Sequence, residues 1–293
     1  MIKIDDIKKL MECTILTGFI KPDRQDKITS LLIVADVESG KSELIKTMRS
    51  YPNTCYTNDL SFKGLIDEIL PKVEQDLITH ILIPDLINVL SHRRASDTLF
   101  PHLNSIMEGE LRDIKFYGSS KTFSKDIMAG LVVGTTKHSF EQKLKSWRNN
   151  GFLSRILPLT FAYSEMTRLE IDEAIKFGTY TEPEKAVKDF KNIKPHSFTV
   201  NIPLDVAKQI QIMKDGLLAL NEYYVLGRTV GGYKLQLQKY GFRLHKQLRT
   251  LIKGICLYNA QFLPNVYTYE VTENDFNDLM TLSKFMNFKF NEI

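Results

Sequence analysis

The chain has 293 residues, of which 43% are hydrophobic and 25% are charged, and its formal net charge is +4. This suits one large or two modest domains with a substantial core, and the mildly basic balance is compatible with a nucleic-acid partner. Its three cysteines, Cys13, Cys55 and Cys256, form no C-x-x-C pair and indicate neither a disulfide framework nor a zinc site.

The charged N-terminus has no signal-peptide core, and no apolar run approaches the roughly 20 residues that span a bilayer. The sequence therefore predicts a cytoplasmic protein with no membrane partner.

Apolar spacing predicts alternating helices and strands along the first half of the chain. In chain order we expect a helix at 3–13, a strand at 31–34 followed by a loop and a helix to 48, a strand at 54–57, a helix at 60–73, a strand at 80–85, a helix at 97–110, a hairpin at 111–125, and strands at 127–136 and 156–163. This alternation predicts an α/β fold, doubly wound around a mainly parallel sheet.

The composition changes near residue 165. Residues 166–203 are rich in Lys, Glu, Asp, Thr and Pro and are predicted to connect two units. Residues 1–165 form the α/β nucleotide-binding core of this prediction. Residues 204–293 form a helical domain, with helices at 204–226, 233–262 and 273–290.

The segment L-L-I-V-A-D-V-E-S-G-K-S, residues 31–42, has the order of a phosphate-binding loop: a buried strand, a turn, G-K-S and a helix. In such a loop Lys41 reaches the β- and γ-phosphates of ATP and Ser42 binds Mg²⁺. We expect the nucleotide to contact Ala35, Val37, Glu38, Ser39, Gly40, Lys41, Ser42 and Glu43. Ala35 stands where the pattern has its first glycine, and the alternative is a chance G-K-S.

Two later strands end in polar residues that suit the same site. Asp85 ends an apolar strand, where a carboxylate would orient the Mg²⁺ held by Ser42; its alternative role is to cap a helix. Thr136 ends the strand G-L-V-V-G-T-T and is expected to sense the γ-phosphate, or else to cap the next helix. The residue after Asp85 is Leu86, so no adjacent carboxylate can act as general base.

Two arginines are candidates for stabilising charge during phosphoryl transfer. Arg155 precedes a strand at the edge of the sheet, where it could project toward the nucleotide of a neighbouring subunit. Arg243 begins a helix of the C-terminal domain, from which it could close over the bound nucleotide. The alternatives are a structural salt bridge for Arg155 and a solvated basic helix face for Arg243.

The hairpin at 111–125 carries the candidate nucleic-acid contacts Arg112, Lys115 and Lys121. Basic side chains there supply salt-dependent attraction to a phosphate backbone, and neighbouring aromatic residues could stack on bases. The alternative is an ordinary solvated hairpin with an aromatic inner side.

Together these motifs resemble the AAA+ ATPases, and among them the minichromosome-maintenance (MCM) type of replicative helicase, over residues 25–290. A-D-V-E-S-G-K-S is similar to the Walker A loop, I-L-I-P-D to Walker B, G-T-T to sensor 1, F-L-S-R-I to the arginine-finger motif, and F-R-L-H-K-Q-L-R-T-L-I to the sensor-2 helix of the lid. The resemblance implies ATP bound with Mg²⁺ between subunits of a ring, often a hexamer, with hairpins facing a central channel. Short chains of this kind suggest a mobile genetic element.

The expected function is therefore that of an ATP-driven motor or helicase that forms a ring on DNA during replication. Leu86 favours a second function, a nucleotide-gated scaffold that hydrolyses little ATP and loads or regulates a separate helicase. A weaker third alternative is a remodeller that acts on protein partners.

Overall fold

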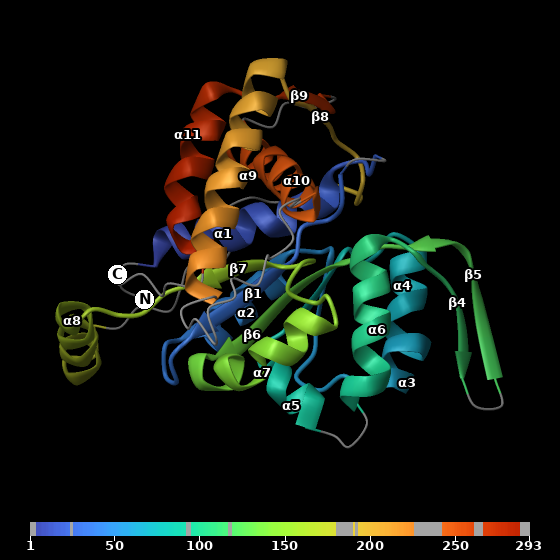
Figure 1. The fold of residues 1–293 in the computed structure, drawn as a ribbon, viewed down its shortest axis with the longest axis horizontal. Helices are drawn as coiled ribbons and strands as arrows, with labels where there is room; N and C mark the ends of the chain where they lie inside the picture. The colour runs from blue at the N-terminus through green and yellow to red at the C-terminus, as the bar shows by residue number, and fades with distance from the viewer. Residues whose placement is uncertain are drawn as a thin grey trace, which may run out of the picture.

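The structure is a computed structural model that describes residues 4–23, 26–91, 95–116, 119–179, 190, 193–225, 242–260 and 266–287. At its centre lies a five-stranded sheet in which every pair of neighbours is parallel (Figure 1). In spatial order its strands are β2 (Thr54–Tyr56), β3 (His80–Ile83), β6 (Gly130–Thr136), β1 (Leu31–Ala35) and β7 (Leu157–Thr160). The predicted α/β class with a parallel sheet is confirmed.

Helices cover both faces of this sheet, which explains why β1 is an unbroken apolar run with every residue buried. Leu31 and Ile33 belong to one hydrophobic cluster, and Leu32 and Val34 belong to the other. The first cluster includes α1 (Asp5–Leu16), α2 (Lys41–Thr47) and the C-terminal helices. The second includes α3 (Phe62–Gly64), the π-helical turn η3 (Leu65–Ile69), α4 (Leu70–Glu74), α5 (Leu86–Ser91), α6 (Ala95–Glu108) and α7 (Lys137–Asn149).

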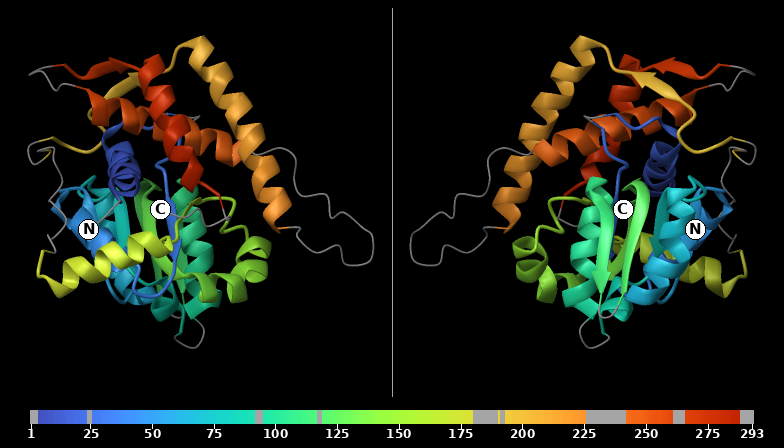
Figure 2. Two further views of the ribbon diagram at one scale, coloured as in Figure 1. Left: turned by 90° about the vertical axis from the view of Figure 1, so that its left-hand side faces the viewer. Right: turned by 90° about the vertical axis from the view of Figure 1, so that its right-hand side faces the viewer.

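The three predicted C-terminal helices are α9 (Leu204–Val225), α10 (Phe242–Asn259) and α11 (Glu273–Leu282). They lie together with the small parallel sheet of β8 (Thr199–Asn201) and β9 (Thr268–Glu270) at one end of the molecule (Figure 2). They share the first cluster with α1 and β1, so they pack directly on the α/β core. Residues 226–241, which include part of the helix predicted at 233–262, lie outside the described residues.

A buried ion pair ties α10 to the segment that leads into β1. Asp26, 3% exposed, accepts from Arg249 Nε at 3.2 Å and from the ammonium of Lys253. A buried carboxylate requires such partners because desolvation penalises an isolated charge. This contact fixes the position of α10 relative to the sheet.

The predicted strand at 127–136 is corrected by the structure. The hairpin is present as β4 (Leu111–Phe116) and β5 (Ser119–Ile127), but β5 continues to residue 127 and β6 begins only at Gly130. Between them the chain turns back toward the sheet, where Ala129 N–H donates to the carbonyl of Ile106 and Gly130 N–H to that of Thr79. Two strands of different sheets therefore occupy what reads as one apolar run.

The predicted connecting segment contains one regular helix, α8 (Glu165–Lys176). Ser164 caps it by accepting from Thr167 N–H at 3.2 Å. Residues 180–189, 191 and 192 of this segment lie outside the described residues.

The polarity of the parallel strands gives the sheet two different edges. The amino edge is where the strands begin and the carboxyl edge is where they end. Leu157 is paired with Leu31, and its N–H donates to the carbonyl of Ser30 at 2.9 Å, so residues 154–156 lie at the amino edge. The loop that follows Ala35 lies at the carboxyl edge, about 16 Å away along five residues of strand.

Among the described residues, no helix has the length and apolar character needed to cross a bilayer. Cys13, Cys55 and Cys256 are all free thiols, in agreement with the absence of a predicted disulfide framework.

His80 is a fully buried histidine at the start of β3. Its Nε2 lies 3.2 Å from the carbonyl of Thr29 and its Nδ1 lies 3.2 Å from the hydroxyl of Thr79. A carbonyl accepts only, so Nε2 carries the proton and Nδ1 accepts from the hydroxyl. Burial lowers the pKa of His80 to about 3, against a weaker opposing effect of the Thr29 carbonyl. The side chain is therefore neutral in the folded protein.

We predict that this histidine makes stability fall in acid. Between pH 6.5 and about 3 the unfolded chain binds a proton at His80 that the folded chain does not, so the free energy of unfolding decreases as the pH falls. Urea unfolding of the wild type and His80→Gln at pH 7 and pH 5 should show the wild type's advantage shrinking by about 2 kcal/mol. An advantage that is the same at both pH values would contradict a neutral buried His80.

Candidate functional site

The loop between β1 and α2 forms a tight turn at the carboxyl edge. Glu38 (φ 63°) and Gly40 (φ 74°) both adopt the left-handed conformation, which glycine reaches without strain and glutamate does not. Ser39 lies between them, 4% exposed, and its hydroxyl has no hydrogen-bond partner among the described residues. Turns of this kind aim successive backbone N–H groups at one point and bind anions.

Lys41 is the buried cation of this loop. Its side chain points back along the turn, and Nζ donates to the carbonyl of Asp36 at 3.2 Å. Burial lowers the pKa of the Lys41 ammonium, while the carboxylates of Asp85 and Asp36 act in the opposite direction. The ammonium therefore lies within electrostatic range of Asp85 at the end of β3.

Asp85 follows β3 at the same edge. Its Oδ1 accepts from Ile87 N–H at 3.0 Å at the start of α5, so the helix-capping alternative is realised by one of its two oxygens. Ser42 and Glu43 are exposed at the start of α2, and Val37 and Glu38 are exposed in the loop. The predicted metal and nucleotide contacts thus share one edge with Lys41.

The structure gives the hydroxyl of Thr136 a structural task. It accepts from Ser139 N–H at 3.2 Å and caps α7, which is the alternative that the sequence leaves open. The neighbouring Thr135 is paired with Val34, and its buried hydroxyl has no partner among the described residues. Since β6 lies between β1 and β3, both threonines lie between the Lys41 loop and Asp85.

Two residues that contact the loop at the carboxyl edge are not predicted from the sequence. The hydroxyl of Tyr163 donates to the carbonyl of Ser39 at 2.9 Å, which joins the loop to the segment that follows β7. Arg168 Nη2, on α8, lies 4.0 Å from Asp36 Oδ2. Neither residue belongs to a sequence motif. Each comes close to the loop only because the chain passes along the carboxyl edge after β7.

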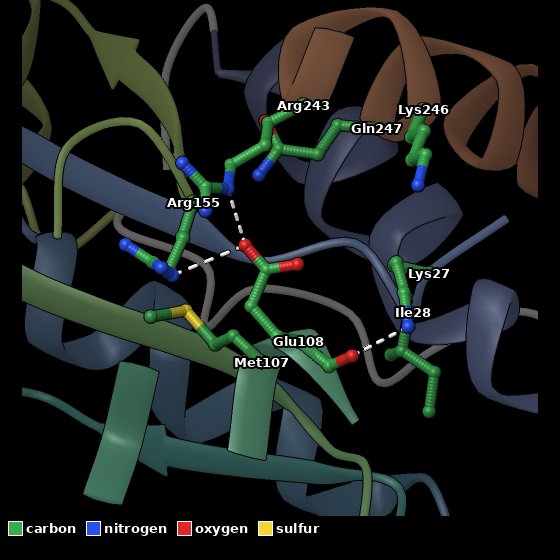
Figure 3. A pocket seen from close by; sticks show the side chains of 8 residues that line it. All are labelled: Lys27, Ile28, Met107, Glu108, Arg155, Arg243, Lys246 and Gln247. Carbon is green, nitrogen blue, oxygen red and sulfur yellow. Dashed lines mark hydrogen bonds and ion pairs between the residues drawn. The ribbon is translucent and has the colours of Figure 1, made fainter. Parts of the chain in front are cut away.

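Arg155 and Arg243 meet at the opposite, amino edge (Figure 3). Arg155 Nε lies 3.1 Å from Glu108 Oε1, and the Nε of Arg243 pairs with the same oxygen. Arg155 thus has the salt bridge that the sequence leaves as its alternative. Arg243, near the start of α10, lies beside residue 154. The sheet separates it from the Lys41 loop, so in this structure Arg243 does not lie over that loop, where the sequence predicts it.

A pocket surrounds these side chains at the amino edge. It is lined by Lys27, Ile28, Met107, Glu108, Arg155, Arg243, Lys246 and Gln247. Four of these residues are cationic and one is a carboxylate, so the lining carries a net positive charge.

The predicted nucleic-acid contacts on the hairpin differ from one another. Arg112 and Lys115 are exposed on β4. Lys121 is half-buried, and its ammonium donates to the carbonyl of Ile66 at 2.7 Å, where it joins the hairpin to η3. Residues 117–118 of the predicted hairpin lie outside the described residues.

No group of three or more His, Cys, Asp or Glu side chains that could hold a metal occurs among the residues that the structure describes. Nucleotide-bound Mg²⁺ does not require one, because one or two protein ligands, substrate phosphates and waters complete its coordination.

Neither the protein-family models nor the curated proteins contain a match to this chain. Functional inference therefore rests on the residues and geometry of the two edges.

The cap at α7 gives a test of what Thr136 does. We expect Thr136→Ala to lower the free energy of unfolding by about 1 kcal/mol, because the N–H of Ser139 loses its acceptor. Thr136→Ser keeps the hydroxyl and should retain most of that stability in urea unfolding. Equal stability of the alanine variant and the wild type would contradict a capping role.

Proposed function

We propose that the chain is an ATP-binding protein of the AAA+ type, most similar to the MCM helicases, that self-associates and acts on DNA during replication. The observation that carries this proposal is the buried Lys41 ammonium inside a turn with two left-handed residues. A buried ammonium whose partner among the described residues is a backbone carbonyl at 3.2 Å is suited to receive phosphate oxygens.

The unpartnered hydroxyl of Ser39 supports the same site. A buried hydroxyl without a partner costs free energy, and an anion in the turn would supply the missing acceptor. In this proposal Ser42 and Asp85 hold Mg²⁺, which neutralises charge on the transferred phosphoryl group when bound. Residues 35–43 of the loop contact the nucleotide.

The position of Arg155 requires a neighbouring copy of the chain. Because it lies at the amino edge, it cannot reach the loop of its own chain across the sheet. We place it, together with Arg243, against the nucleotide of the next copy, where guanidinium groups offset the charge of the transition state. Self-association into a ring follows from this placement, with the helical C-terminal domain, which packs on the α/β core, acting as a lid over the nucleotide of the next copy.

Leu86 supports a second function, the nucleotide-gated scaffold or helicase loader. This leucine is fully buried in the second hydrophobic cluster, so no carboxylate can replace it there without disrupting packing. Phosphate release measured with and without single-stranded DNA separates the two functions. DNA-stimulated turnover supports the motor, and tight ATP binding without turnover supports the scaffold.

We predict that Lys41→Ala abolishes ATP binding, because it removes the cation that completes the phosphate cradle. A fluorescent ATP analogue titrated into wild type and variant measures the effect. Lys46→Ala is the matched control: it removes an equal charge from the exposed side of the same helix, where the partner of Lys46 within the described part of the chain is Glu43, at 3.4 Å. Unchanged affinity in Lys41→Ala would refute the site.

We also predict that the three hairpin cations separate into two kinds. Arg112→Ala and Lys115→Ala should weaken DNA binding, and each should reduce the slope of log affinity against log salt by about 1. Lys121→Ala should chiefly lower the unfolding midpoint, because it removes the bond to Ile66. Salt titrations of DNA binding, paired with thermal unfolding, measure both effects; slopes unchanged in the first two variants would argue for the protein remodeller.

A further inference from the structure

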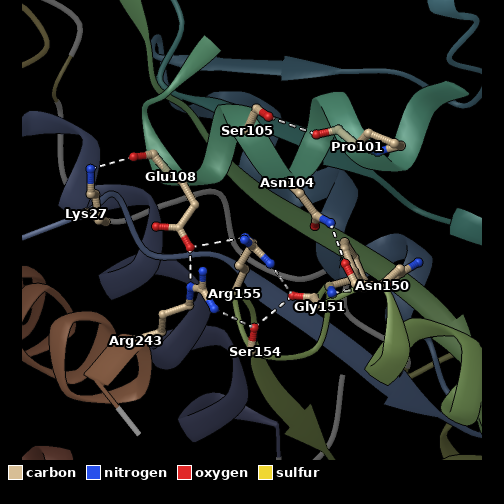
Figure 4. Close-up of polar contacts among 11 residues, drawn as sticks. Lys27, Pro101, Asn104, Ser105, Glu108, Asn150, Gly151, Ser154, Arg155 and Arg243 are labelled. Carbon is tan, nitrogen blue, oxygen red and sulfur yellow. Dashed lines mark hydrogen bonds and ion pairs between the residues drawn. The ribbon is translucent and has the colours of Figure 1, made fainter. Parts of the chain in front are cut away.

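Glu108 lies at the C-terminal end of α6 and contacts both arginines of the amino edge (Figure 4). A single oxygen, Oε1, faces the Nε of Arg155 and the Nε of Arg243. The Glu108 side chain is only 13% exposed, and Arg155 is 18% exposed. Two guanidinium groups this close repel each other, and a shared carboxylate between them offsets that repulsion.

The contacts leave the outer end of each arginine available. Arg155 Nε forms an ion pair with Glu108 Oε1 at 3.1 Å that lacks hydrogen-bond geometry, and its Nη1 donates to the carbonyl of Gly151 at 2.7 Å. Arg243 uses Nε for Glu108 and Nη1 for the hydroxyl of Ser154 at 3.4 Å. Neither Nη2 bonds to another described residue. The carboxylate therefore contacts the Nε side of both guanidinium groups.

The chain around this cluster is built to keep it in place. Gly151 adopts φ +75°, and a Cβ there would come within 2.5 Å of Arg155 Nη1, so the close approach requires glycine. The ammonium of Lys27 donates to the backbone carbonyl of Glu108, and Asn104 Nδ2 bonds the carbonyl of Asn150 at 3.0 Å. These bonds join α6, the segment before β1 and the loop before β7.

We propose that Glu108 is a positioning residue that aligns Arg155 and Arg243 as one unit for the nucleotide of a neighbouring copy. This inference rests on the proposed function. Glu108 itself does not touch nucleotide; it sets the direction of the two groups that do. Arg155 and Arg243 are consequently coupled, and losing the carboxylate impairs both.

Glu108→Gln tests this role, with Glu110→Gln as the matched control. Both variants lose one carboxylate at the end of α6, but Glu110 is exposed and interacts with Arg155 only through its charge. We expect Glu108→Gln to lower turnover at saturating ATP at least tenfold while ATP affinity changes less than twofold. Glu110→Gln should stay within twofold of wild type in both.

A double-mutant comparison separates positioning from simple stabilisation. In an Arg155→Ala, Arg243→Ala background, Glu108→Gln should have no further effect on turnover, because the groups that it aligns are gone. If hydrolysis is too slow to measure, the readout is self-association in the presence of a non-hydrolysable ATP analogue. The mass of the complex measures that association. Glu108→Gln should weaken it at least fivefold and Glu110→Gln should not.

The outcomes distinguish the two levels of the proposal. Wild-type protein that does not bind ATP refutes the proposed function, and the inference fails with it. A second result overturns the inference about Glu108 but leaves the proposed function standing. In that result the wild-type protein binds ATP and either hydrolyses it or self-associates, and Glu108→Gln behaves like Glu110→Gln. A further loss on adding Glu108→Gln to the double arginine variant would assign Glu108 a role that does not pass through the arginines.

Discussion

The polarity of the parallel sheet is the constraint on which the functional geometry depends. Every strand of the sheet runs in one direction, so the turn after β1, the end of β3 and the end of β6 all meet at the carboxyl edge. The same constraint sends the residues before β7 to the amino edge. The Lys41 loop and the arginine pair thus lie at opposite edges of the sheet in one chain, and in the proposed function a second copy brings them together.

The α/β fold and the order of strand, loop and helix at residues 31–48 are readable from the sequence because their signals are local. The apolar run before the loop and the spacing of α2 are properties of neighbouring residues, and the structure has both the strand and the helix. The prediction of a single strand at 127–136 is wrong because its boundaries depend on distant residues. Its apolar residues are continuous, but they serve two sheets, and the backbone bonds of Ala129 and Gly130 that divide them come from residues far away in the chain.

Side-chain partners were harder to predict for the same reason. Thr136 and Lys121 are polar residues in positions that suit ligands, yet nearby backbone groups occupy them: an N–H three residues away in one case, and a carbonyl of η3 in the other. The sequence predicts Arg243 over the nucleotide because its helix resembles the sensor-2 helix of a lid domain. The packing of α10 against α1 and the buried Asp26 fix that helix at the other edge.

Buried polar atoms without a hydrogen-bond partner among the described residues occur at both edges of the sheet. At the carboxyl edge they include the hydroxyls of Ser39 and Thr135, and Lys41 donates to the carbonyl of Asp36. At the amino edge Glu108 lies between two arginines, and the buried Nε of Arg155 lies 3.1 Å from Glu108 Oε1 without making a hydrogen bond. In the proposed function, the cations of the amino edge face the nucleotide bound at the carboxyl edge of a neighbouring copy. Association between copies is part of that proposal because the sheet separates the two edges within one chain.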